Sequence, residues 1–197
     1  APETYMEKIS ANVSEQGVID LDYSIKKNIY NLSDYFNKKP NDLTACILDR
    51  PRHKLMIEEL NSLKVKIKLI SDGDVSGALL VTDKKYNVDV FLGIGGGPEG
   101  VLAASALDTF GCTFQGRFLF DTEEKKIRAN NMGIKDFKKK YELSEIVSGD
   151  SIFCATGITS GDLLNGIKIK NNLFTSETLV THKSSKLKKI IKNEEKI

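Results

Sequence analysis

The chain has 197 residues, and its 29 Lys and Arg nearly balance its 27 Asp and Glu, for a formal net charge of +2. This length suffices for one domain with a large core, and the balanced charge excludes the strongly basic surface of a nucleic-acid-binding protein. The apolar runs are too short to cross a membrane, and no secretory signal pattern opens the sequence. We expect a soluble, cytoplasmic protein with a single domain over residues 1–197.

The start of the chain has no clear pattern, although residues 5–9 fit one helical turn. The first clear element is a helix over residues 23–38, which Asp22 or Ser24 can cap and Pro40 ends. Its apolar side chains recur at helical spacing, at Ile25, Ile29, Leu32 and Phe36. We interpret this helix as part of the scaffold.

Strand, short loop and helix then alternate three times. The predicted strands are 43–48, 65–70 and 88–92, and the predicted helices are 54–63, 75–81 and 101–110. This alternation predicts an α/β fold with parallel strands in a sheet flanked by helices. The three loops leave the carboxyl ends of their strands, which is the edge where open α/β sheets bind ligands.

After Gly111 the pattern changes to further strands and one broken helix. The predicted strands are 113–120, 151–155, 163–170 and 173–181, the helix is 122–141 with a break at 130–133, and a basic tail covers 183–197. Asn171 and Asn172 are expected to join the last two strands as a hairpin. We expect the tail to be solvated.

The three cysteines and two histidines are widely spaced. Cys46, Cys112 and Cys154 each lie in an apolar, strand-like context, which favours buried free thiols in a reducing compartment over a metal or redox site. His53 and His182 are too few and too far apart for a histidine metal site.

A glycine-rich stretch, GIGGGPEG, covers residues 93–100 between a predicted strand and a predicted helix. Such a junction can direct backbone N–H groups at an anion, and Pro98 suits the first turn of the helix. Glu99 is favoured at the helix start and can point at the same site. An ordinary glycine-rich turn explains the stretch equally well. It matches neither the dinucleotide fingerprint nor a Walker A loop.

The first loop places Pro51 between two arginines. Arg50 and Arg52 can hold a phosphate through their paired N–H groups, and the proline stiffens their presentation. The alternative is a pair of surface arginines bound to helix carboxylates.

The second loop carries Asp72 and Asp74 on either side of Gly73, so both carboxylates can face one ligand. Carboxylates accept hydrogen bonds from sugar hydroxyls or bind a hard cation, whereas the alternative is a helix cap with a turn. Glu99 alone is a poor metal site, because Mg²⁺ and Mn²⁺ prefer several oxygen ligands.

Arginines for phosphate, carboxylates for hydroxyls and a glutamate for a metal together describe a site for a phosphorylated polyol or sugar. Thr156, Thr159 and Asp162 either complete the rim of this site or form turn and cap contacts. The sequence shows neither a Ser-His-Asp triad nor a reactive Cys–His pair.

Four motifs occur in the order and spacing of a known family. They are LDRPRH at 48–53, LISDGDV at 69–75, GIGGGPEGV at 93–101 and ATGITSGDLL at 155–164. The sequence resembles class II fructose-1,6-bisphosphatase over nearly its whole length. The resemblance implies hydrolysis of the 1-phosphate of fructose 1,6-bisphosphate with Mn²⁺ or Mg²⁺. It also implies the layered α/β sandwich of the lithium-sensitive sugar and inositol phosphatases, with a mostly parallel or mixed sheet.

The resemblance also assigns roles to residues. It makes Glu99 a metal ligand, and it names no catalytic residue in this chain. The substrate-binding residues that it implies are Tyr5, Arg50, Pro51, Arg52, Asp72, Gly73, Asp74 and Gly96. Of these, the arginine loop lines the phosphate pocket, the 72–74 turn contacts the sugar, and the glycine contributes backbone.

One departure from the family is large. The family carries an Asp-rich segment, of the Asp-x-x-Glu-Gly-Thr type, that supplies most metal carboxylates and positions the attacking water, and this sequence lacks it. We therefore expect the chain to correspond to the C-terminal portion of the enzyme and to be nearly inactive alone. Its expected partners are a sugar bisphosphate, the missing N-terminal portion and further copies of itself. The alternatives are a non-catalytic sugar-phosphate-binding module and a doubly wound nucleotide-binding protein.

Overall fold

The computed structural model describes residues 2–196. Its strands are β1 (Tyr5–Ala11), β2 (Thr44–Leu48), β3 (Lys66–Ile70), β4 (Val90–Gly96), β5 (Thr113–Leu119), β6 (Lys140–Glu142), β7 (Ile152–Thr156), β8 (Lys168–Lys170), β9 (Leu173–His182) and β10 (Leu187–Lys196). Its α-helices are α1 (Ile25–Phe36), α2 (Lys54–Ser62), α3 (Asp74–Leu79), α4 (Gly97–Asp108), α5 (Glu123–Asn131) and α6 (Leu143–Ile146). None of the helices in the described part of the chain has the length and apolar character needed to span a membrane.

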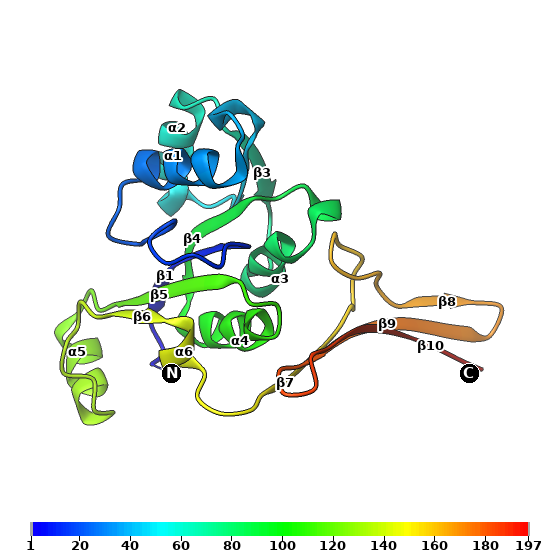
Figure 1. Cartoon of the computed structure of the whole chain (residues 1–197). Helices are drawn as coiled ribbons and strands as arrows, with labels where there is room; N and C mark the ends of the chain where they lie inside the picture. The colour runs from blue at the N-terminus through cyan, green and yellow to red at the C-terminus, as the bar shows by residue number, and fades with distance from the viewer. Residues whose placement is uncertain (1, 197) are drawn as a thin grey trace.

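A six-stranded mixed sheet, in the order β3-β2-β4-β1-β5-β6, forms the body of the molecule (Figure 1). Strands β2, β3 and β4 are parallel, as the alternation of strands and helices predicts. Strand β1 runs antiparallel to both of its neighbours, β4 and β5. The predicted α/β fold with a mixed sheet flanked by helices is confirmed.

Both faces of the central strands are buried, which explains why their sequences are continuously apolar. Val90 of β4 belongs to a core that packs under α1 and α2. The next residue, Phe91, faces the opposite way and packs with α3 and α4. The helices therefore form one layer on each side of the sheet, and the strand ends remain free to carry a site.

The first predicted helix is confirmed with shorter ends. The Oγ of Ser24 accepts a hydrogen bond from the N–H of Lys27 at 3.1 Å, so Ser24 rather than Asp22 is the N-cap. The helix ends at Asn37, which adopts the left-handed conformation with φ of 50°. The chain thus leaves the helix before Pro40.

The helical turn predicted for residues 5–9 is wrong, because this segment is the central strand β1. Its side chains alternate between the two cores. Ile9 faces α1 and α2, whereas Lys8 and Ser10 face α3, where they contact Asp74 and the carbonyl of Ala78. A lysine and a serine on a buried strand face hide the period-two pattern in the sequence.

The glycine-rich stretch is the second correction, because residues 93–96 are the end of β4 and not a loop. Their backbone pairs with β1, with Gly93 opposite Lys8 and Gly96 opposite Tyr5. Helix α4 begins at the next residue, Gly97. The strand and the helix therefore meet without an intervening loop.

The second half of the chain differs more from the predictions. The break at 130–133 is confirmed, but the helical continuation to residue 141 is wrong, since residues 140–142 form β6 against β5. The basic tail is exposed to solvent as expected, but it is also ordered as a strand, because β10 pairs with the whole length of β9. A turn at Lys186, whose φ is 53°, connects β9 to β10. The pairing of these two strands orders the charged segment.

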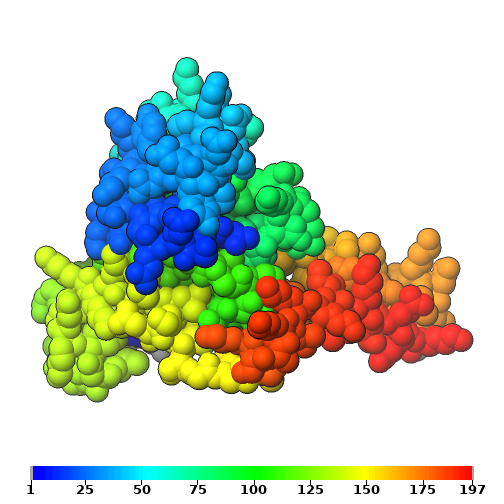
Figure 2. All heavy atoms as spheres, in the orientation of Figure 1, coloured from blue at the N-terminus to red at the C-terminus, as the bar shows by residue number. Residues whose placement is uncertain are grey.

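Strands β7 to β10 form a second sheet, in the order β10-β9-β7 with β8 also paired to β9. The predicted hairpin of β8 and β9 is confirmed, and Asn171 and Asn172 turn it with φ values of 52° and 59°. The outer part of this sheet projects as an arm from the body (Figure 2). Only the part near β7 packs on the α4 side of the core, through Phe153 and Leu179.

Candidate functional site

The ends of β1, β2 and β4 bring an aromatic ring and an arginine together. The Arg52 guanidinium lies 4.9 Å from the centre of the Tyr5 ring, an arrangement that suits a cation–π contact. Its Nε donates to the carbonyl of Ile94 at 2.7 Å, which fixes the stem of the guanidinium against β4. The start of β1, the loop after β2 and the end of β4 thus meet at this edge. They bring together Tyr5 and Arg52, two of the expected substrate-binding residues.

Arg50 links the first loop to the second. Its Nη2 lies 3.8 Å from the Asp72 Oδ1, and its Nη1 donates to the carbonyl of Asp49 at 3.0 Å. The Arg50–Asp72 pair is exposed, so it contributes little to stability and leaves both groups free to meet a ligand. Pro51 opens a short 3₁₀ turn, Pro51–His53, that leads directly into α2.

The two aspartates of the second loop point in different directions. The Asp72 side chain is 93% exposed, whereas that of Asp74 is 3% exposed and forms an ion pair with Lys8. Between them Gly73 has φ of +91°, a conformation that suits glycine. The idea that both carboxylates face one ligand is therefore wrong for this structure.

At the strand–helix junction, the backbone N–H groups already have partners. Gly96 donates to the Glu99 Oε2 at 3.0 Å, and Gly97 donates to the carbonyl of Thr4 at 2.8 Å. Glu99 thus caps α4 as the helix dipole favours. The N–H groups of Gly96 and Gly97 are not presented to an anion here, contrary to the expectation from the glycine pattern.

Glu99 is the candidate metal ligand, and its carboxylate is the one acidic group at the start of α4. Within residues 2–196, no group of three His, Cys, Asp or Glu side chains is placed to hold a metal ion. Mg²⁺ and Mn²⁺ require several oxygen ligands, so the described residues do not fit a complete site for either.

His53 is a site residue that the sequence analysis missed. It is fully buried, its Nδ1 lies 2.7 Å from the carbonyl of Leu48, and its Nε2 accepts from the N–H of Ile94 at 2.8 Å. A neutral ring with the proton on Nδ1 satisfies both bonds. Because its partners are backbone atoms on β2 and β4, no side-chain motif announces this role.

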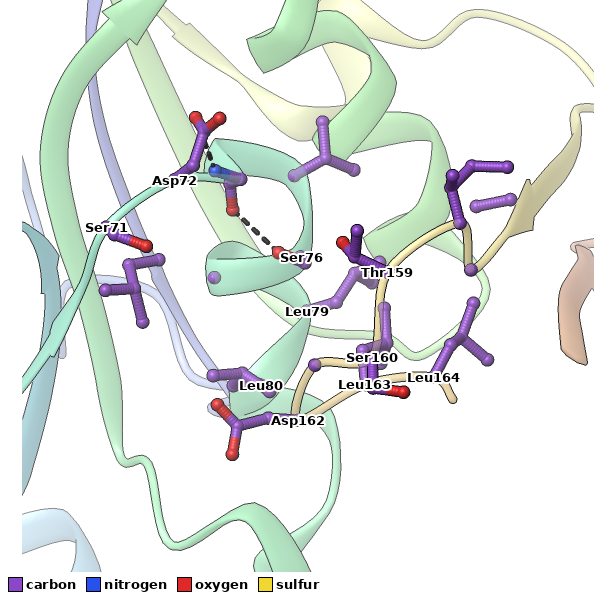
Figure 3. Close-up of a pocket in the computed structure, with 18 of the residues that line it drawn as sticks. Ser71, Asp72, Ser76, Leu79, Leu80, Thr159, Ser160, Asp162, Leu163 and Leu164 are labelled. Atoms are coloured by element: carbon purple, nitrogen blue, oxygen red, sulfur yellow. Dashed lines mark hydrogen bonds between the residues drawn. The ribbon is translucent and has the colours of Figure 1, made fainter. Parts of the chain in front are cut away.

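A cavity of about 740 Å³ opens beside the second loop (Figure 3). Asp72, Gly73 and Ser76 line one side, and Thr159 and Ser160 lie opposite, while Glu99 also reaches it. Its floor is apolar, with Val75, Leu79, Leu80, Phe153, Leu163 and Leu164. A volume of this order accommodates a small ligand.

The wall opposite the second loop is a compact loop, residues 157–167. Its backbone closes on itself, since the Ile167 N–H donates to the Ile158 carbonyl at 3.1 Å. A Cβ on Gly166 would lie 2.5 Å from the backbone nitrogen of Ser160, so the loop can close only with glycine there. Asp162 pairs with Lys68 of β3 at 2.9 Å, which ties this wall to the main sheet.

The sequence leaves two roles open for Thr156, Thr159 and Asp162, either the rim of the site or turn and cap contacts. All three line the cavity, which supports the role at the rim. Two of them make structural contacts as well, because the hydroxyl groups of Thr156 and Thr178 lie 2.9 Å apart and Asp162 pairs with Lys68.

Asp72 lines the cavity and also pairs with Arg50, so it joins the cavity to the edge that carries the two arginines. Arginines, an exposed carboxylate and a helix-capping glutamate in this part of the molecule suit a phosphorylated polyhydroxyl compound.

The expectation of three buried thiols is confirmed for Cys46 and Cys112 and wrong for Cys154, which lies on the open face of β7, opposite to Phe153. Burial raises the pKa of both buried thiols to about 12. We therefore expect Cys154 alone to react with a disulfide reagent at pH 8 in the native chain, and all three thiols in denaturant. Counting released chromophore checks this, and a C154S variant that keeps the fast-reacting thiol would contradict it.

Comparison with known proteins finds similarity over nearly the whole chain. Residues 1–195 match the family described as bacterial fructose-1,6-bisphosphatase, glpX-encoded. The chain is 40% identical over 205 residues to the fructose-1,6-bisphosphatase class 2 of Haemophilus influenzae, covering 96% of this chain and 61% of that relative.

Two cyanobacterial relatives are named D-fructose 1,6-bisphosphatase class 2/sedoheptulose 1,7-bisphosphatase. They come from Synechococcus sp. JA-3-3Ab and Synechocystis sp. PCC 6803, and each is 35% identical, covering 94% of this chain and 57% of the relative. The chain thus spans about 60% of the length of the curated relatives it matches. With a family match over almost all of its residues, the chain belongs to the glpX-encoded bacterial fructose-1,6-bisphosphatases.

Proposed function

We propose that this chain carries the sugar-bisphosphate-binding portion of a metal-dependent phosphatase, which hydrolyses the 1-phosphate of fructose 1,6-bisphosphate to give fructose 6-phosphate. The observation that carries the proposal is the meeting of Tyr5, Arg52 and the Arg50–Asp72 pair at one edge of the sheet. Family membership supplies the reaction class.

Each group at this edge has a task in binding. The guanidinium groups of Arg50 and Arg52 bind one phosphate, and Arg52 is held ready by its bond to Ile94. The exposed Asp72 carboxylate accepts hydrogen bonds from sugar hydroxyls, and the turn at Gly73 lets the backbone approach the ring. Pro51 keeps the arginine turn rigid, which lowers the entropy cost of binding.

We place Glu99 as one ligand of a divalent cation, Mn²⁺ or Mg²⁺, that would neutralise phosphoryl oxygens and activate water when bound. The other ligands are proposed to come from the portion of the protein that the relatives have in addition. This division agrees with the described residues, among which no group of three His, Cys, Asp or Glu side chains could hold a metal ion, whereas an octahedral cation needs several oxygen ligands.

We also propose a cytoplasmic protein, since the chain has two buried free thiols that suit a reducing compartment. Assembly into a homo-oligomer is proposed on family analogy.

Binding of fructose 1,6-bisphosphate to the chain, measured by calorimetry, tests the substrate part of the proposal. We expect binding by the wild type, a loss of about tenfold or more in R52A, and an intermediate affinity in R52K, which keeps the charge but loses the paired donors. R128A is the matched control, because Arg128 pairs with Glu124 on α5. A wild-type chain that does not bind this sugar bisphosphate would refute the proposal.

Phosphate release with Mn²⁺ tests the enzymatic part. The isolated chain is expected to show almost none, whereas its fusion behind the N-terminal portion of the Haemophilus influenzae relative is expected to be active. The E99Q change should abolish turnover of the fusion while leaving sugar-bisphosphate binding largely intact. If the isolated chain binds the ligand but the fusion remains inactive, the non-catalytic binding module becomes the better description.

A further inference from the structure

Lys8 is a charged side chain that is almost fully buried on the central strand β1. It lies on β1, 1% of its side chain is exposed, and its ammonium group pairs with the Asp74 carboxylate, whose side chain is 3% exposed. Removing two charges from water is costly, and well-packed apolar residues often stabilise a core as well or better. A pair in this position therefore calls for a reason other than stability.

The glycines of the 93–100 stretch make room for this pair. A Cβ on Gly95 would overlap the Asp74 Oδ2, and a Cβ on Gly100 would lie 2.9 Å from the Lys8 Cε. The ion pair thus accounts for glycine at position 95, and together with the Met6 side chain it accounts for glycine at position 100.

Lys8 also lies within reach of the charges of the proposed site. Burial lowers its pKa, while the neighbouring Asp74 and Glu99 carboxylates act to raise it and the Arg52 guanidinium acts to lower it further. Its ammonium group is therefore electrostatically coupled to residues on three of the converging segments.

Asp74 connects this pair to the ligand-facing turn. It is the first residue of α3 and follows Gly73 directly, so its position sets where Asp72 stands. Its Oδ2 is held by Lys8, and its Oδ1 is buried and has no hydrogen-bond partner among residues 2–196. On the same strand, Tyr5 contacts Arg52, so β1 supports both loops of the site.

We propose that Lys8 is a positioning residue for sugar-bisphosphate binding: its ammonium group holds Asp74, and thereby the 72–74 turn, in a fixed place relative to the strand–helix junction that carries Glu99. The inference rests on the proposed function for its ligand. In this proposal Asp74 acts as the buried partner of Lys8 and fixes the turn from within the core.

Three variants test the role of Lys8. K8M removes the charge, K8M/D74L replaces the pair by apolar side chains so that no charge stays buried alone, and L32A weakens the distant core under α1. Each is measured for thermal unfolding, for fructose 1,6-bisphosphate affinity well below its melting temperature, and for amide hydrogen exchange.

We expect K8M and K8M/D74L to bind the sugar bisphosphate about tenfold or more weakly, and to exchange amides faster at 72–76 and 94–100. L32A is expected to lower the melting temperature and leave affinity and these amides unchanged. If K8M does not fold, the affinity and the hydrogen exchange of K8M/D74L test the proposal. A folded variant lacking Lys8 with wild-type exchange in both segments overturns the proposal.

A wild type that fails to bind the ligand refutes the proposed function, and the exchange data still decide whether Lys8 fixes the two segments.

Discussion

Replacing Gly95 by alanine is expected to lower the free energy of unfolding by about 3–5 kcal/mol, the usual cost of breaking a buried ion pair. The added Cβ would overlap the carboxylate of Asp74, which lies in the core with 3% of its side chain exposed. If the carboxylate moves away, Lys8 loses its partner in a place that water does not reach. The chain contains no Trp, so denaturant unfolding is best followed by far-ultraviolet circular dichroism.

Gly161 provides the matched control for this change. Apart from its chain neighbours, no atom of the described residues lies within 4 Å of the place where a Cβ would stand on Gly161, so G161A is expected to change stability by less than about 1 kcal/mol. Equal stability of G95A and the wild type would show that the ion pair rearranges without cost, and would remove the steric explanation for glycine at this position.

His53→Ala is expected to cost about 2–5 kcal/mol, because it leaves two buried backbone groups without partners at about 1–3 kcal/mol each and opens a cavity. The carbonyl of Leu48 and the N–H of Ile94 both bond to this ring, which is fully buried. Because Ile94 also accepts from Arg52, the variant should bind fructose 1,6-bisphosphate more weakly than the wild type.

The second histidine is the natural comparison. His182, the last residue of β9, pairs at 2.7 Å with Asp150, which precedes β7, and both side chains are partly exposed, so H182A is expected to cost less than about 1 kcal/mol and to leave ligand binding unchanged. Chemical denaturation of both variants at pH 7.5 checks the ranking. Similar losses for H53A and H182A would contradict the role given to His53.

The sequence predicts the βα units between residues 43 and 110 well because their signals are local. Strands β2 and β4 contain apolar runs, β3 alternates lysines with apolar residues, and parallel strands follow from the alternation of strands and helices. The edge where Arg50, Arg52 and Asp72 meet follows in turn from parallel strands. These features need no knowledge of distant partners.

The remaining elements depend on partners far along the chain. Strand β1 is hidden because Lys8 faces inward, and only Asp74 explains why a lysine is there. The glycines at 93–96 extend β4 because β1 offers them a ladder, and the charged β10 is a strand because β9 does the same. Backbone pairing of this kind leaves little trace in the side chains.

The central place of β1 has a consequence for the order in which the protein folds. Tyr5 pairs with Gly96 on one side and with Leu119 on the other, so β1, which is synthesised before β4 and β5, can take its place in the sheet only when both neighbours are present. The βα units in between rely on contacts between nearby residues and can assemble earlier, whereas closing the sheet requires contacts of large sequence separation. The insertion of one early strand between two late ones is therefore the step that joins the halves of the sheet, and the same step brings Tyr5 to Arg52 and Lys8 to Asp74.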